Sequence, residues 1–222
     1  MDSDPHGQRP RLSYLLPLAC LFVSCLLIST TISVKIIAVG MLTLPAGIII
    51  YPMVSTLGDV ITEVYGFKNA RRVIFTGLAC LVLIHFVYLI AVALPPAAFW
   101  NQQESFAAIL GYAPRIALAA LCAYPVGEIV NSAVLSKLKA VRSNDHPSTR
   151  FFLSTLVGQG VDSLIFITIA FAGTIGLGQL LNLMFFSWLM KVLWETIALP
   201  ISVAAANMIK RLEGGEVTDF HV

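Results

Sequence analysis

Charged residues are scarce in this sequence. Only 12% of the 222 residues are Asp, Glu, Lys or Arg, against roughly 25% in a typical soluble domain, and 58% are hydrophobic. These proportions exclude an ordinary soluble globular protein and predict an integral membrane protein. The formal net charge of +2 is too small to indicate a nucleic-acid partner.

Motifs for catalysis and for metal or nucleotide binding are also missing. The chain contains no G-x-x-x-x-G-K-[ST] sequence, so it does not itself carry a P-loop for ATP. No serine or cysteine nucleophile is placed with a histidine in the apolar stretches, and the four cysteines lack metal-ligand spacing. We therefore predict neither an enzyme nor a metal or cofactor site. An intramembrane enzyme stays as an alternative class, because buried carboxylates can serve as general acids and bases.

Six apolar stretches are each long enough to cross a bilayer, which takes about 20 residues. They are Tyr14–Val34, Leu44–Tyr65, Val73–Leu94, Arg115–Leu138, Phe151–Ala172 and Asn182–Met208. Pro45 and Pro52 predict that the second stretch is broken or kinked, and Gly66 is expected to end it. The sequence thus predicts an all-α integral membrane fold with six transmembrane helices in a single domain, residues 12–211. A disordered N-terminal tail (residues 1–11) and a C-terminal tail (residues 212–222) flank this domain.

The basic residues lie in alternate connecting segments. The N-terminal tail, the second loop, the fourth loop and the C-terminal tail carry them, whereas the third and fifth loops have none. Because cytoplasmic segments are enriched in Lys and Arg, this pattern predicts that both termini face the cytoplasm. Lys35 is the one exception in this count.

Ionisable residues nevertheless occur inside the apolar stretches. They are Asp59, Glu63, Glu128, Asp162, Glu195 and Lys191. Since such groups are too costly to leave facing lipid, we expect them to form a polar layer in the interior. Three simpler interpretations stay open: a structural hydrogen bond from Gln159 or Asp162, an intrahelical ion pair between Lys191 and Glu195, and a pair of Glu63 with Arg71 or Arg72 at the interface.

A short sequence pattern is repeated in the fourth and fifth stretches. Residues Gly127–Ser132 and Gly158–Ser163 share the pattern G-[EQ]-x-V-[ND]-S. Each copy begins around ten residues from the basic loop between the two stretches, or about 12–15 Å at helical rise. Antiparallel neighbouring helices would therefore bring both copies to one level. Simple packing of small residues between membrane helices is the alternative explanation.

These segments resemble the queuosine precursor transporter family, also called the vitamin uptake transporter family of six-span membrane proteins. The similar segments are L-T-L-P-A-G-I-I-I-Y-P (Leu42 to Pro52), D-V-I-T-E-V-Y-G (Asp59 to Gly66), P-R-I (Pro114 to Ile116) and S-T-L-V-G-Q-G-V-D-S-L-I-F-I-T-I-A-F-A-G (Ser154 to Gly173). The resemblance implies uptake of 7-cyano- and 7-aminomethyl-7-deazaguanine, precursors of the modified tRNA base queuosine, across the bacterial inner membrane.

The polar layer suits such a substrate chemically. A guanine-like edge offers adjacent N–H donors that a carboxylate accepts in a paired geometry, and its flat ring favours an aromatic platform. We predict Asp162 and Glu128 as the acceptors, with Gln159 and Asn131 reading the ring carbonyl. The remaining members of the predicted site are Asp59, Glu195, Lys191, Trp188, Trp194 and Phe166, and Tyr124 is a further stacking candidate.

The expected partners are this small molecule and the lipid bilayer. A homodimer is a candidate assembly of the protein. Because the chain has no P-loop, the energy for uptake must come from an ion gradient or from another subunit. The main alternative function is therefore a substrate-binding membrane subunit for another vitamin or nucleobase, which needs an energising partner.

Overall fold

The computed structural model describes residues 14–141 and 147–213. The predicted disordered tail, residues 1–11, and most of the predicted C-terminal tail lie outside the described residues. The elements are α1 (Leu15–Ile32), β1 (Ile36–Val39), β2 (Leu42–Pro45), a 3-10 turn (Ala46–Ile49), α2 (Tyr51–Ala93), α3 (Gln103–Leu110), α4 (Ala113–Val141), α5 (Pro147–Phe171) and α6 (Leu177–Glu213). The prediction of an all-α membrane fold is correct in its coarse form, with one small antiparallel hairpin added.

Five helical segments are long and apolar enough to cross a membrane. They are Leu15–Ile32, Lys68–Ala93, Gln103–Asn131, Phe152–Phe171 and Leu177–Glu213. Five of the six predicted spans thus have a counterpart in the part of the chain that the structure describes. The second predicted span, Leu44–Tyr65, is only partly helical, because its first residues form β2 and the 3-10 turn.

The helical part of that second span is one arm of α2. Helix α2 covers residues 51–93, but Gly66 within it has φ 77° and ψ 164°, and the chain reverses direction there. Glycine adopts a positive φ without steric cost, so the prediction that Gly66 ends a helix is confirmed. The arm from residue 51 to residue 65 is about 22 Å long at helical rise, which is shorter than a bilayer core of about 30 Å.

The hairpin of β1 and β2 and the 3-10 turn come before the short first arm of α2 in the chain. Non-helical backbone is tolerated at membrane depth only where protein covers it, and Ala46, Gly47 and Ile48 are buried. Gly47 packs directly on the end of α1: a Cβ atom at this position would lie 2.1 Å from Ser33 Oγ. Ser29 Oγ also donates a hydrogen bond to the Gly47 carbonyl at 3.0 Å. Only glycine fits this contact.

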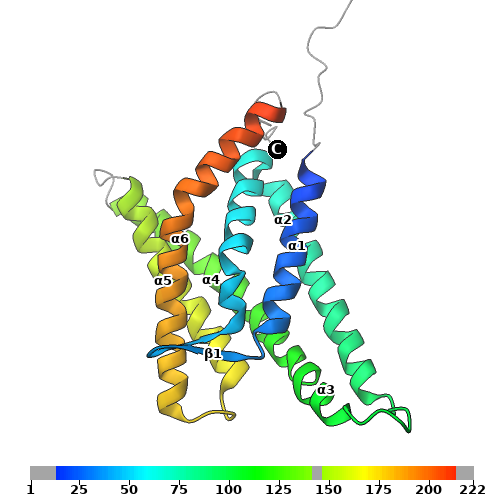
Figure 1. The fold of residues 1–222 in the computed structure, drawn as a ribbon. Helices are drawn as coiled ribbons and strands as arrows, with labels where there is room; N and C mark the ends of the chain where they lie inside the picture. The colour runs from blue at the N-terminus through cyan, green and yellow to red at the C-terminus, as the bar shows by residue number, and fades with distance from the viewer. Residues whose placement is uncertain (1–13, 142–146, 214–222) are drawn as a thin grey trace, which may run out of the picture.

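Both ends of the described chain lie at the same end of the molecule (Figure 1). The Tyr14 amide donates a hydrogen bond to Glu213 Oε1 at 2.9 Å, and the Tyr65 hydroxyl donates to the same oxygen at 2.8 Å. The bend at Gly66 is therefore also at this end. The chain passes between the two ends of the molecule in α1, in each arm of α2, and in α4, α5 and α6. Because the number of passes is even, the described chain finishes at the end where it started.

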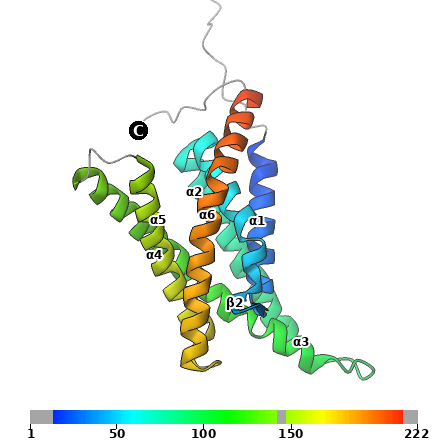
Figure 2. The same ribbon diagram turned by 60° about the vertical axis from the view of Figure 1, so that its left-hand side comes forward.

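Helix α6 lies between two groups of helices, with α1 and α2 on one side and α4 and α5 on the other (Figure 2). Toward its C-terminal end, Ala206 and Ile209 pack in a core with residues of α1 and α2. Toward its N-terminal end, Leu183 packs in a second core with residues of α4 and α5. The part of α6 between the two cores carries Lys191 and Glu195.

Arg115 lies at the end opposite the termini, where the sequence pattern contains few positive charges. Its Nε donates to the Ile169 carbonyl at 2.7 Å, and its Nη2 donates to the Ala172 carbonyl. The guanidinium also lies 5.7 Å from the centre of the Tyr112 ring. Arg115 thus caps the C-terminus of α5, where the helix dipole favours a cation. This local role explains a basic residue at this end.

Candidate functional site: a polar cluster between α5 and α6

The two copies of the repeated pattern meet where α4 crosses α5. A Cβ atom on Gly127 would lie 2.8 Å from the Cβ atom of Asp162, and one on Gly158 would lie 2.6 Å from the Cβ atom of Asn131. The first residue of each copy therefore packs against the fifth residue of the other copy. The prediction that the copies lie at one level is confirmed, and the glycines have the packing role that was the alternative explanation.

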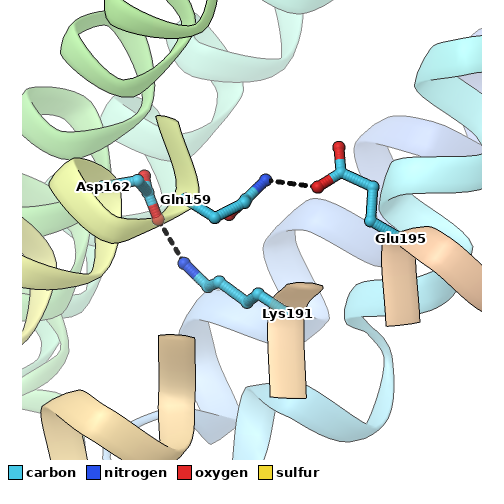
Figure 3. Close-up of polar contacts among 4 residues, drawn as sticks. All are labelled: Gln159, Asp162, Lys191 and Glu195. Atoms are coloured by element: carbon cyan, nitrogen blue, oxygen red, sulfur yellow. Dashed lines mark hydrogen bonds and ion pairs between the residues drawn. The ribbon is translucent and has the colours of Figure 1, made fainter. Parts of the chain in front are cut away.

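Four polar side chains of α5 and α6 form a cluster at this level (Figure 3). Asp162 Oδ2 of α5 accepts a charge-assisted hydrogen bond from Lys191 Nζ of α6. Gln159 Nε2 donates to Glu195 Oε2 at 3.0 Å. The side chains of Lys191 and Asp162 are each only 14% exposed, so their pair is largely shielded from the surroundings. We call Gln159, Asp162, Lys191 and Glu195 the polar cluster.

The structure bears on two interpretations that the sequence left open. Lys191 forms an ion pair with Asp162 of the neighbouring helix α5. Glu63 lies at the end of the molecule that holds the termini, as one alternative supposed, but its partner is Lys210 at 2.7 Å and not Arg71 or Arg72. The lysine reaches Glu63 because the end of α6 packs along α2.

Two aromatic rings surround the Lys191 ammonium group. Its Nζ lies 5.3 Å from the centre of the Tyr51 ring and 5.6 Å from that of the Phe166 ring. Both distances are within the range of cation–π attraction.

Tyr51 is a site residue that the sequence reasoning missed. It starts α2 directly after the 3-10 turn, and Pro52 follows it in the first turn of the helix. The only signal was its place in the segment Leu42–Pro52, which carries part of the family resemblance. The hairpin and turn bring this ring to the cluster, so its role depends on a segment that was predicted as helix.

Two amide oxygens at this level have unused hydrogen-bonding capacity. Within the described part of the chain, Gln159 Oε1 and Asn131 Oδ1 are buried and find no hydrogen-bond partner. Buried polar atoms are nearly always paired, and an exception calls for an explanation. Both atoms are acceptors, so they suit a ligand that brings N–H donors.

The other predicted site residues have separate places. Asp59 is exposed on α2 and accepts a hydrogen bond from Ser202 Oγ of α6 at 3.3 Å, outside the polar cluster. The Trp188 indole N–H donates to the Leu156 carbonyl at 3.0 Å, which holds its ring against Gly160. Trp194 is half-buried. The side chain of Glu128 lies outside the described residues.

A cavity of about 370 Å³ lies elsewhere, between the hairpin and the first turns of α6. Its lining residues are Ile36, Met41, Thr43, Ile175, Gly178, Gln179, Asn182 and Leu183. None of the predicted site residues lines it. A cavity without ionisable side chains is a poorer match to a polar ligand than the polar cluster, so we take the cluster as the candidate site.

Five helices long and apolar enough to cross a bilayer define the class of this chain, a multi-pass membrane protein. A family model described as "Putative vitamin uptake transporter" matches residues 45–205. The chain belongs to this transporter family.

A curated relative from Bacillus subtilis (strain 168) is named "Probable queuosine precursor transporter". It is 29% identical to this chain over 181 residues, which cover 79% of this chain and 77% of the relative. No solved structure matches the chain.

Proposed function

We propose that this protein imports the queuosine precursors 7-cyano- and 7-aminomethyl-7-deazaguanine across the bacterial inner membrane, driven by an ion gradient. The observation that carries the proposal is the polar cluster, in which two carboxylates and an amide lie beside aromatic rings at the contact of α5 and α6. The name of the Bacillus subtilis relative supports the same substrate class.

The cluster matches the hydrogen-bonding pattern of a guanine-like edge. That edge presents adjacent N–H donors, and a carboxylate or an amide oxygen accepts them. Glu195 and the unpaired oxygens of Gln159 and Asn131 supply such acceptors. The rings of Tyr51 and Phe166 offer apolar faces for the flat heterocycle.

The direct test is uptake by the purified protein in proteoliposomes. We expect labelled 7-aminomethyl-7-deazaguanine to accumulate when an ion gradient is imposed. Empty liposomes made in parallel are the control. Uptake no faster than in empty liposomes, under proton and sodium gradients alike, would contradict the proposed function.

The same assay tests selectivity. Adenine presents an acceptor where guanine presents its ring N–H, so binding adenine would leave an acceptor of the site without a donor. Each buried group left unpaired costs about 1–3 kcal/mol. We therefore expect adenine to compete with the labelled substrate at least roughly tenfold more weakly than unlabelled 7-deazaguanine derivatives do. Equal competition by adenine would show that the cluster serves protons or helix packing and not base recognition.

The orientation in the membrane is a further prediction. The end that holds Tyr14, Gly66 and Glu213 also carries the basic residues Lys68, Arg71 and Arg72, and the positive-inside rule places this end in the cytoplasm. A reporter that is active only in the periplasm, fused after Arg211, should be inactive. The same reporter inserted after Asn101, in the connection before α3, should be active. The reverse result would overturn this orientation.

A further inference from the structure

The ammonium group of Lys191 occupies a small site with a defined chemistry. One side is the Asp162 carboxylate, and the rings of Tyr51 and Phe166 lie 5.3 and 5.6 Å from Nζ. A carboxylate combined with aromatic faces is the arrangement by which proteins recognise ammonium ligands. We call Asp162, Tyr51 and Phe166 the cation cage.

The polar cluster contains more carboxylates than ammonium groups. Asp162 and Glu195 are two carboxylates, and Lys191 is the one cation among the four residues of Figure 3. The cluster therefore offers a carboxylate to each of two ammonium groups, that of Lys191 and one brought by a ligand.

Lys191 has a second carboxylate within reach. Glu195 lies four residues further along α6, on the same face of the helix, and its Oε2 accepts a hydrogen bond from the Gln159 amide. The flexible four-carbon stem of a lysine allows its ammonium to move between two neighbouring acceptors. If Lys191 moved to Glu195, the cage would open for another cation, and the Gln159 amide would be free to contact a ligand.

We propose that the cation cage is the subsite for a primary ammonium group of the transported molecule, and that Lys191 occupies it until the substrate arrives. This inference rests on the proposed function. The substrate's ammonium replaces Lys191 on Asp162, and Lys191 moves to Glu195. The aminomethyl group of 7-aminomethyl-7-deazaguanine is such an ammonium at neutral pH, whereas the cyano group of the other precursor is uncharged. The cage therefore selects the cationic precursor.

The test is the ratio of the half-inhibitory concentrations of the cyano and aminomethyl derivatives, measured against labelled 7-aminomethyl-7-deazaguanine in proteoliposomes. In the Lys191→Met variant no lysine occupies the cage, so the aminomethyl derivative should inhibit at a lower concentration. The ratio of the cyano to the aminomethyl value should therefore rise by about tenfold. The Phe166→Leu variant keeps every charge and removes one aromatic face. Its ratio should fall severalfold.

A matched control is Phe185→Leu, because Phe185 is 51% exposed and stacks near Trp188, outside the cage. Its ratio should equal that of the wild type. An unchanged ratio in Phe166→Leu, or a lower ratio in Lys191→Met, would overturn the inference even if both derivatives compete. If Lys191→Met does not fold, Phe166→Leu alone decides. If neither derivative competes in the wild type, the proposed function itself fails.

Discussion

Replacement of Asp162 by asparagine is expected to reduce transport by about 10- to 100-fold, since a hydrogen bond to a charged group contributes about 1.5–3 kcal/mol. The substitution keeps the shape and most of the hydrogen bonding of the side chain and removes its charge. Folding should be affected less, because Lys191 has Glu195 one turn away on the same helix as an alternative partner. The measurement is queuosine formation from supplied precursor in cells that cannot make it, together with the amount of monodisperse protein.

The double variant Asp162→Asn, Lys191→Gln separates transport from structure. It removes both members of the ion pair at once, so neither is left buried without the other, and stability should return toward the wild-type value. Transport should stay lost. If the double variant transports as well as the wild type, the pair of Asp162 and Lys191 is structural. From its place in the repeated pattern, Glu128→Gln is expected to impair transport in the same way.

The Gly158→Ala variant is expected to lose about 1–3 kcal/mol of stability, the usual cost of forcing extra atoms into a close contact. The added Cβ atom would lie 2.6 Å from the Cβ atom of Asn131 and 3.1 Å from the carbonyl oxygen of Gly127. Neither neighbour is the movable end of a side chain, so α4 and α5 must separate. Thermal stability in detergent, followed by loss of the monodisperse peak, measures the effect.

Gly178→Ala on α6 is the matched control for Gly158→Ala. A Cβ atom at Gly178 would meet nothing within 4 Å, and alanine is favoured over glycine in a helix by about 1 kcal/mol. This variant should be as stable as the wild type or more stable. Gly127→Ala should behave like Gly158→Ala, because the two contacts are reciprocal. Equal stability of Gly158→Ala and Gly178→Ala would show that α4 and α5 do not cross at these glycines.

The sequence by itself determined the class of the protein and the level of its polar residues. Long apolar stretches decide membrane insertion locally, since each must bury its own backbone hydrogen bonds. The repeated pattern was enough to predict that Asn131 and Asp162 lie at one level, because helical rise converts residue number into depth. Gly66 was predictable as a helix end for a similarly local reason, its freedom to adopt positive φ.

Only the tertiary structure decided which groups meet at that level. Lys191 is four residues from Glu195, so the spacing allowed a pair within α6, but the packing of α5 on α6 brings Asp162 to the Lys191 ammonium. The segment before Tyr51 was predicted as helix because strands of four residues are too short to show a clear alternation of apolar and polar residues. Tyr51 reaches the cluster through that hairpin, by contacts between residues far apart in the chain, which no local pattern encodes.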